Sequence, residues 1–296
     1  MAYPLSIQNE RELPDGYDAC VFVWDIDKTY LATRFSSMRG LSRIPFEFAI
    51  DKRAIPGMPE ILRGLRRGPG PRFACAPLYF VSASPPQLRS VVQRKMQLDG
   101  VEWDGIIFKD WLGTLMQLRP GRLRDQIGFK LAALLTGRLQ RAQPSECLFG
   151  DDVESDAEAF WLYARILDGE LGAGELEQRL ISASVPADDR QAIQDLISRL
   201  PAKRGSVEQI YVHLERNSPP EAFARFGERV CPVKGACQLG LALFQAGHLD
   251  AQAVRDACQT VAASRRYRFG DVDALAEDAL ARGLIEPGRL AGLEIS

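Results

Sequence analysis

The chain has 296 residues, 46% of them hydrophobic, which is enough to bury one large core or a core with an appended unit. Its 37 basic and 39 acidic residues nearly cancel and are interspersed, so no net field attracts nucleic acid or anionic membranes from a distance. No run approaches the roughly 18 consecutive apolar residues of a membrane span. These numbers predict a soluble globular protein with no transmembrane segment and no nucleic-acid partner.

The first residues, MAYPLSIQNERELPDGYDAC, lack the basic flank and apolar stretch of a secretory signal. Six cysteines are scattered without a C-x-x-C spacing, and the chain has two histidines, so the sequence does not favour a zinc site of the usual kind. Thiols distributed in this way fit a reducing compartment, and we therefore expect a cytoplasmic protein. The cysteines are Cys20, Cys75, Cys147, Cys231, Cys237 and Cys258.

Short apolar runs predict a sheet of five or six strands. The clearest are continuously hydrophobic rather than alternating, which is typical of strands buried on both faces of a parallel sheet. The runs cover residues 20–25, 77–82, 104–111, 147–151, 210–214 and 228–233.

Helical patterns lie between these runs. They begin at Met58, Pro85 and Phe129, and another follows residue 233. The pattern at Pro85 opens with two prolines, which suit the first turn of a helix. Because strands and helices alternate along the chain, we predict an α/β fold with a three-layer, doubly wound, Rossmann-like parallel sheet.

Two stretches depart from this alternation. Residues 157–203 contain amphipathic helical segments with no strand between them, which indicates a helical insertion. Its apolar faces must be buried, either on the core or as a cap over a site. The pattern after residue 249 is again helical, so we divide the chain into a core of residues 1–248 and a C-terminal helical extension, residues 249–296, packed on that core.

Acidic and hydroxyl side chains directly follow three of the predicted strands. In open α/β sheets, ligands bind at the carboxyl ends of the strands, so these side chains should meet at one edge. Lys130 opens the helix before the strand 147–151 and can point its ammonium to the same edge. Such a set outlines a phosphoryl-transfer site. The side chains are those of Asp25, Asp27, Ser82, Asp151, Asp152 and Asp156.

Asp25 and Asp27 stand two positions apart, and their charges repel unless a cation or a proton compensates them. Mg²⁺ prefers oxygen ligands and stabilises clustered carboxylates, so we predict a Mg²⁺ cofactor. Asp25 is placed to attack phosphorus as a nucleophile. Asp27 is placed to protonate the leaving oxygen and later to activate water. The alternative interpretation is a strand end with two solvated charges.

These residues carry a resemblance. DIDKT (25–29), the strand-end Ser82, Lys130 and GDDVESD (150–156) resemble, in this order, the four motifs of the haloacid dehalogenase superfamily. Within it, the chain is similar to the catalytic domain family of the actin-patch phosphatidate phosphatase over roughly residues 18–248, the helical insertion excepted. The supporting segments are YFVSASPPQLRSVVQRKM (79–96), FKDW (108–111), FKLAAL (129–134) and IYVHLER (210–216).

The resemblance implies a haloacid-dehalogenase-like phosphatase that hydrolyses phosphomonoesters with Mg²⁺ through an aspartyl-phosphate, with phosphatidate as one substrate of the family. It implies roles for individual residues: Asp25 as nucleophile, Asp27 as acid/base, Asp25, Asp27 and Asp151 as metal ligands, Ser82, Lys130 and Thr29 as phosphate-binding residues, and Asp152 and Asp156 as supporting residues. The sequence departs from the family at Asp152, where Ser is usual, at SASPP (82–86), where Asn and Trp are expected, and at Lys28, where another Asp is frequent.

Alternatives remain open at two levels. The same residues serve mutases and phosphotransferases, and a catalytically silent protein that binds phosphate or a partner would keep many of them. Lys109 competes with Lys130 for the phosphate, Asp156 is also a candidate helix cap, and His213 and His248 are expected to be structural.

The spacing of the motifs bears on the substrate. About 50 residues separate Asp27 from Ser82, and a similar number separate Ser82 from Lys130, so neither interval holds a large cap domain. An open site of this kind favours a bulky or lipid phosphate as substrate.

Overall fold

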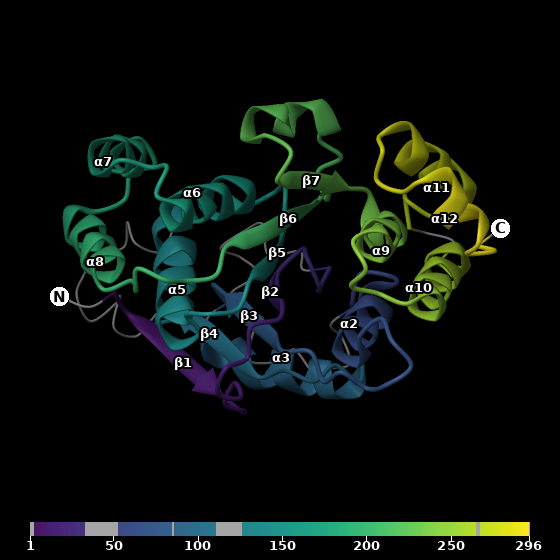
Figure 1. Cartoon of the computed structure of the whole chain (residues 1–296), viewed down its shortest axis with the longest axis horizontal. Coiled ribbons are helices and arrows are strands. Elements are labelled where there is room, and N and C mark those ends of the chain that lie inside the picture. Colours follow the sequence, from purple (N-terminus) through teal and green to yellow (C-terminus); the bar gives the residue numbers. More distant parts are fainter. Residues whose placement is uncertain (1–2, 33–52, 85, 111–125, 265–266, 296) are drawn as a thin grey trace.

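The computed structural model describes residues 3–32, 53–84, 86–110, 126–264 and 267–295. Within them, seven strands form one sheet with helices on both faces (Figure 1). The sheet order is β1-β4-β3-β2-β5-β6-β7. The strands are β1 (Leu5–Asn9), β2 (Val21–Asp25), β3 (Leu78–Ser82), β4 (Gly105–Lys109), β5 (Glu146–Asp151), β6 (Val207–His213) and β7 (Val230–Val233).

Strands β2 to β7 are all parallel, and their order is that of a doubly wound nucleotide-binding sheet. From the central β2 the chain moves outward through β3 and β4, then returns to β5 on the other side of β2. The winding direction therefore reverses between β2 and β5. The predicted fold class, an α/β three-layer Rossmann-like sheet, is confirmed.

The edge strand β1 was not predicted. It pairs antiparallel with β4, with Leu5 opposite Lys109 and Asn9 opposite Gly105. Its residues LSIQN are short of apolar side chains and only half-buried, so they form no continuous hydrophobic run. The sequence of β1 therefore lacks the signal that predicts a buried parallel strand.

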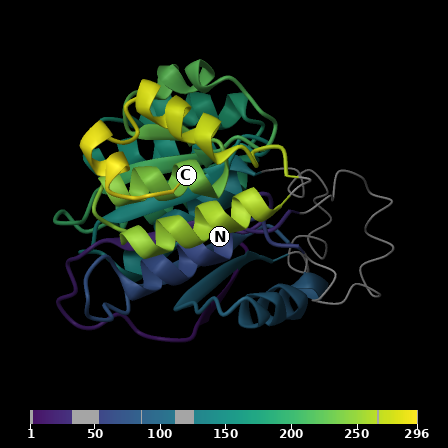
Figure 2. The ribbon, with the colours of Figure 1, turned by 90° about the vertical axis from the view of Figure 1, so that its right-hand side faces the viewer.

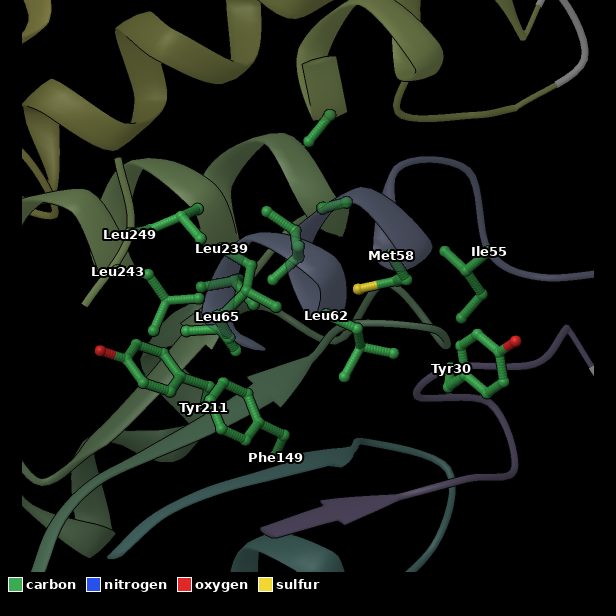
Figure 3. Packing of buried hydrophobic residues seen from close by; sticks show 14 of the residues in the cluster. Tyr30, Ile55, Met58, Leu62, Leu65, Phe149, Tyr211, Leu239, Leu243 and Leu249 are labelled. Carbon is green, nitrogen blue, oxygen red and sulfur yellow. The ribbon is translucent and has the colours of Figure 1, made fainter. Parts of the chain in front are cut away.

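The pleat of the sheet divides its side chains between two cores. Phe22 and Trp24 of β2 belong to one cluster, whereas Val21 and Val23 belong to the other, as expected when successive side chains point to opposite faces. In the first cluster, Trp24 and Phe149 stack with ring centroids 4.1 Å apart. Figure 3 shows this cluster, in which leucines of the covering helices pack on the sheet.

Two layers of helices cover these cores. On the face of Trp24 lie α2 (Met58–Arg67), α3 (Pro86–Leu98), α9 (Gly235–Gln245), α10 (Ala251–Ala263), α11 (Val272–Ala281) and α12 (Pro287–Ala291). On the opposite face lie α5 (Ile127–Gln140), α6 (Asp156–Asp168), α7 (Ala173–Ser182), α8 (Ala187–Ser198) and the short 3₁₀ helix η4 (Pro220–Phe226).

Several predicted bounds shift in the structure. The run 104–111 corresponds to β4, which ends at Lys109, and the run 210–214 to β6, which begins earlier, at Val207. The helix expected from Pro85 begins at Pro86; Pro85 and Trp111 lie outside the described residues.

The helices of the predicted insertion pack on the body of the fold. α6 begins at Asp156 and packs on β5 and β6, so it is the crossover helix between these parallel strands. α8 packs against α5, and Leu176, Leu180 and Ile193 are buried in the same core. Of the two interpretations weighed from sequence, burial on the core is the one that these contacts support.

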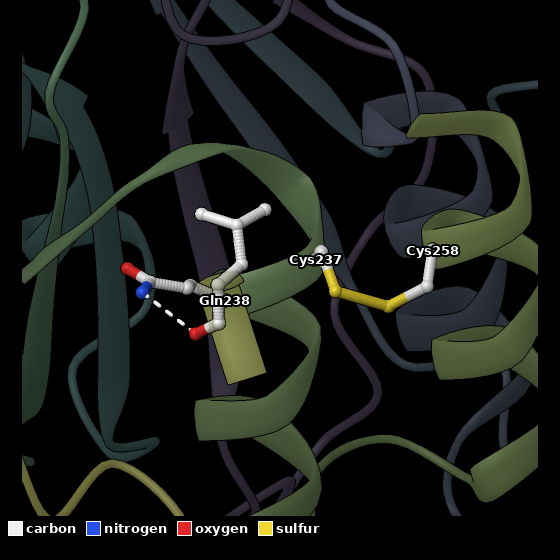
Figure 4. The surroundings of a disulfide bond; sticks show 4 residues. Cys237, Gln238 and Cys258 are labelled. Carbon is white, nitrogen blue, oxygen red and sulfur yellow. Dashed lines mark hydrogen bonds between the residues drawn. A yellow bond between two sulfur atoms is a disulfide. The ribbon is translucent and has the colours of Figure 1, made fainter. Parts of the chain in front are cut away.

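The C-terminal helices pack on the opposite face. α10 lies against α2 and α9, and a disulfide between Cys237 and Cys258 joins α9 to α10 (Figure 4). Gln238 donates from Nε2 to the carbonyl of Leu275 at 3.0 Å, which fixes α11 to α9. The sequence did not predict the disulfide, because its cysteines lie 21 residues apart in different helices. Among the described residues, no helix has the length and apolar character needed to cross a membrane.

Candidate active site

The predicted carboxylates meet where the winding of the sheet reverses. Asp25 is the last residue of β2, Asp151 is the last residue of β5, and these strands are direct neighbours. Both side chains are buried, with 2% and 0% of their surfaces exposed. Ligands of open α/β sheets bind at such a reversal, at the carboxyl ends of the strands.

The loop after Asp25 is a tight turn that is fixed by hydrogen bonds, one of them with His213 of β6. Lys28 has φ = 65°, a left-handed conformation that costs a lysine roughly 1 kcal/mol. Its backbone N–H donates to the carbonyl of Leu31 at 2.7 Å, and its own carbonyl accepts from Nδ1 of His213 at 3.0 Å. His213 is buried, as expected of a structural histidine, and it anchors the loop that carries Asp27.

Lys130 is the cation at the centre of the carboxylates. Its ammonium lies 3.0 Å from Oδ1 of Asp25 and 2.9 Å from Oε2 of Glu154, and it also contacts Asp156. The contacts with Glu154 and Asp156 are hydrogen bonds, and the contact with Asp25 is an ion pair. Although burial acts to lower the pKa of Lys130, Asp25 and Glu154 raise it above its usual value. The lysine is therefore charged and fixes the position of Asp25.

The two carboxylate oxygens of Asp151 differ in their bonding. Oδ1 accepts from the N–H groups of Val153 and Glu154 at 2.5 and 2.9 Å, whereas Oδ2 is buried and has no hydrogen-bond partner among the residues that the structure describes. Burial raises the pKa of Asp151 to about 6 and that of Asp25 well above its usual value, in each case partly opposed by Lys130. Such carboxylates favour a bound cation.

Glu154 completes the carboxylate cluster and was not predicted. One carboxylate oxygen from each of Asp25, Asp151 and Glu154 can be chosen so that all lie within 4.8 Å of one another. Although burial acts to raise the pKa of Glu154, the ammonium groups of Lys130 and Lys28 hold it below the usual value. An all-oxygen ligand set with one unpartnered buried oxygen fits Mg²⁺. The signal was an acidic residue inside GDDVESD, at a position that the family motif leaves open.

Asp156 supports the cluster rather than capping a helix. Its carboxylate accepts from the N–H of Asp151 at 3.1 Å and from Lys130, whereas the N-cap of α6 is Ser155, with no capping bond from its side chain. A Cβ on Gly150 would lie 2.5 Å from the Cβ of Asp156. The glycine of GDDVESD is therefore what lets Asp156 approach the strand end.

The sequence left open whether Asp152 coordinates a metal or faces solvent, and in the structure its carboxylate binds backbone amides. Its carboxylate accepts from the N–H of Arg216 at 2.6 Å and from the N–H of Ser218 at 3.1 Å. These bonds tie the end of β5 to the loop after β6. The carboxylate of Asp152, which stands where the family motif usually has Ser, therefore holds this loop in place. The acidic side chain that lies near Asp151 is that of Glu154.

Ser82 and Asp27 are linked through Ser84, a serine that was not predicted to belong to the site. Oγ of Ser82 accepts from the N–H of Ser84 at 3.1 Å, and Oγ of Ser84 donates to Oδ2 of Asp27 at 2.7 Å. Thr29 donates to Oδ2 of Asp25 at 3.4 Å. The hydroxyls therefore orient both aspartates of the first motif.

Lys109 and Lys130, the two candidates for the phosphate, lie in different surroundings. Lys109 ends β4, and its ammonium lies 5.6 Å from the ring centroid of Phe129. Lys130 is the lysine in contact with Asp25.

The comparison with protein families agrees with this geometry. The family model described as "Phosphatidate phosphatase APP1, catalytic domain" matches residues 20–171, just over half of the chain. The chain belongs to this family. The match includes the segments from Asp25 to Asp156 and confirms the predicted resemblance to this catalytic domain over residues 20–171, whereas the segment IYVHLER (210–216) lies outside it. The family's description names a phosphatase, an enzyme that hydrolyses phosphoric monoesters. No curated protein and no solved structure matches the chain significantly.

Proposed function

We propose that this protein is a Mg²⁺-dependent phosphatase that hydrolyses the phosphomonoester of a lipid phosphate such as phosphatidate. The observation that supports it best is the convergence of Asp25, Asp151, Glu154 and Lys130 at the switch point of the sheet. Membership of a phosphatidate phosphatase family supports the substrate class. The wider likeness to the haloacid dehalogenase superfamily supports the route through a covalent intermediate.

The first step is attack of a carboxylate oxygen of Asp25 on phosphorus. The P–O bond to the substrate breaks as the aspartyl-phosphate forms, and the leaving oxygen takes a proton from the carboxyl group of Asp27. Lys130 holds Oδ1 of Asp25 at 3.0 Å, and Thr29 holds Oδ2 at 3.4 Å, so the nucleophile enters the step with its orientation fixed.

The second step is hydrolysis of the aspartyl-phosphate. Asp27, now a carboxylate, takes a proton from water, and the resulting hydroxide attacks phosphorus and releases phosphate from Asp25. The hydroxyl of Ser84, 2.7 Å from Oδ2 of Asp27, orients the general base. Lys130 and Ser82 are the groups proposed to face the oxygens of the transferring phosphoryl group.

Asp25, Asp151 and Glu154, with the carbonyl of Asp27, are the groups that would hold Mg²⁺. When bound, the cation neutralises charge on the phosphoryl oxygens, which is the main catalytic requirement of this reaction.

The test is phosphate release by the full chain and by Asp25→Asn, with Mg²⁺ and with EDTA, from phosphatidate, an aryl phosphate, sugar phosphates, nucleotides and phosphopeptides. Asn lacks the anionic nucleophile, so we expect Asp25→Asn to lose about 10³-fold or more of the activity. A single turnover should place one phosphoryl group on Asp25 and then release it to water; delivery to another acceptor would indicate a transferase.

Asp195→Asn, an exposed carboxylate on α8, is the matched control and should keep full activity. Equal turnover by Asp25→Asn in its folded form would refute the proposed nucleophile. A chain that binds phosphate and Mg²⁺ but turns over no ester of the panel would be the catalytically silent alternative.

A further inference from the structure

A second cluster of ligand side chains lies at the opposite edge of the sheet. Cys20 directly precedes β2, Cys147 and Glu208 are the second residues of β5 and β6, and His248 follows α9. One ligand atom from each of the four lies within 4.8 Å of all the others. Cys20 and Asp25 lie at opposite ends of β2, about 16 Å apart at roughly 3.3 Å per residue. The cluster is therefore distinct from the candidate active site.

Four distances between ligand atoms of the cluster are close to the edges of a tetrahedral site. Sγ of Cys147 lies 3.6 Å from Sγ of Cys20, 3.7 Å from Nε2 of His248 and 3.9 Å from Oε2 of Glu208. Nε2 of His248 lies 3.3 Å from Oε2 of Glu208. With Zn–S near 2.3 Å and Zn–N or Zn–O near 2.0 Å, the edges of a zinc tetrahedron are about 3.3 to 3.8 Å.

The surroundings hold these ligands in place. Three of them start adjacent strands of one sheet, so the backbone fixes their spacing. The ring of Phe22 meets the imidazole of His248 edge-on, with centroids 5.4 Å apart. Ser145 hydrogen-bonds to the second oxygen of Glu208, an outer contact of the kind that orients metal ligands.

The chemistry of the cluster also suits a cation. Two thiols, an imidazole and a carboxylate are ligand types that zinc binds in proteins. Cys147 is buried, whereas the side chain of Glu208 is 41% exposed, which leaves a route from solvent.

We propose that Cys20, Cys147, Glu208 and His248 bind one Zn²⁺ in a structural site. Four protein ligands close the coordination sphere, which is typical of structural rather than catalytic zinc. On binding, each thiol releases its proton to solvent, and the metal joins the starts of β2, β5 and β6 to the turn after α9. The sequence did not favour such a site because its ligands share no short spacing along the chain.

The test uses the full chain, stripped of metal under reducing conditions and titrated with Co²⁺ and Zn²⁺. We expect thiolate-to-metal charge-transfer absorption and the intense visible bands of tetrahedral cobalt, both saturating at one Co²⁺ per chain and both displaced by Zn²⁺. His248→Gln, at a partly exposed position, and Cys147→Ser should each weaken zinc binding by at least about 100-fold, since even outer-shell changes cost 10- to 100-fold. Zinc should raise the melting temperature of the parent chain and not that of His248→Gln.

Two control variants locate the signal. Cys75→Ser changes an exposed cysteine outside the cluster and should leave the cobalt spectrum unchanged. Asp151→Asn alters the opposite edge of the sheet and should also leave it unchanged. Absence of the thiolate band, or an equal band in His248→Gln, would overturn the proposal.

Discussion

At the scale of single residues, the contact between His213 and Lys28 links the sheet to the candidate active site. The imidazole donates from Nδ1 to the carbonyl of a lysine held in a left-handed conformation, so the neutral tautomer with hydrogen on Nδ1 is the one that fits. Tyr267 lies 3.4 Å from Nε2 and can donate to it. The loop with Asp27 therefore depends on an uncharged histidine.

This dependence predicts a pH effect on stability. Burial lowers the pKa of His213 from 6.5 to about 4, so between these values the unfolded chain binds a proton that the folded chain does not. The contribution of neutral His213 is thus fully present above about pH 6.5 and is lost as the pH falls towards 4. In His213→Asn, which keeps a donor near Nδ1, lowering the pH from about 7.5 to about 5.5 should reduce the free energy of unfolding less than in the parent chain. The difference between the two reductions should be roughly 1 kcal/mol.

The measurement is denaturant unfolding of both chains at the two pH values. Val207→Ala, in the same strand, removes buried apolar atoms and should lower the free energy of unfolding equally at both pH values. An identical pH dependence in the parent chain and in His213→Asn would show that His213 is not held neutral.

The sequence predicted the residues that strand ends bring together, because a strand end and the order of motifs are local signals. Asp25, Ser82 and Asp151 could be found in this way. Glu154 was missed because the fourth motif leaves its position open, and Ser84 was missed because it lies two residues beyond the end of β3, where only Ser82 was taken as a site residue. The partners of Asp152 in the loop after β6 lie more than 60 residues away, so nothing near it in the sequence indicates its role.

At the scale of elements, the packing of α10 on α2 ties the C-terminal helices to the rest of the fold, and the two helices run side by side in Figure 2. The close approach depends on Gly64 of α2, where a Cβ would lie 2.5 Å from the Cβ of Ala253 and 2.6 Å from Cδ1 of Leu249. Helical periodicity predicted both helices, but not this contact, because a glycine in a helix gives no sign of what packs on it.

The contact predicts opposite effects for the same substitution in two helices. In an exposed helix, Gly→Ala stabilises by up to about 1 kcal/mol. Gly64→Ala should instead destabilise by about 1 to 3 kcal/mol, because its methyl group overpacks the interface with α10. A Cβ on Gly174 of α7 would meet no atom within 4 Å, so Gly174→Ala is the matched control and should be neutral or slightly stabilising.

Chemical unfolding of the two variants decides this point. Destabilisation by Gly64→Ala alone would support the prediction that the C-terminal extension, residues 249–296, packs on the core. Equal behaviour of the two variants would mean that α10 does not pack closely on α2 in solution.

At the scale of the whole molecule, the two edges of the sheet hold ligand sets of different chemistry. At the carboxyl ends of β2 and β5, the cluster of Asp25, Asp151 and Glu154 offers oxygen ligands. At the opposite edge, the starts of β2, β5 and β6 and the turn after α9 bring together two thiols, a carboxylate and an imidazole. Hard Mg²⁺ prefers the first set and zinc the second. The rigid parallel strands between them keep the two sets apart, so each edge can be tested without disturbing the other.

The cluster of Asp25, Asp151 and Glu154 exists only in the folded chain, so we predict that Mg²⁺ stabilises that state. At about 100 times the dissociation constant, Mg²⁺ should contribute about 2.7 kcal/mol, which corresponds to several degrees in melting temperature. Asp151→Asn should lose most of this response. It should be no less stable than the parent chain without Mg²⁺, because the amide keeps the acceptor for Val153 and Glu154 and removes a repelling charge.

Asp152→Asn is the matched control for this measurement. Asp152 is the neighbour of Asp151 in the chain, but its carboxylate binds amides of the loop after β6 and not the cluster. The variant should melt at a lower temperature than the parent chain, yet keep the full shift with Mg²⁺. An equal shift in Asp151→Asn would place the cation elsewhere. A normal shift in the parent chain without phosphate release would separate cation binding from catalysis, and it would favour a silent binding protein over the proposed phosphatase.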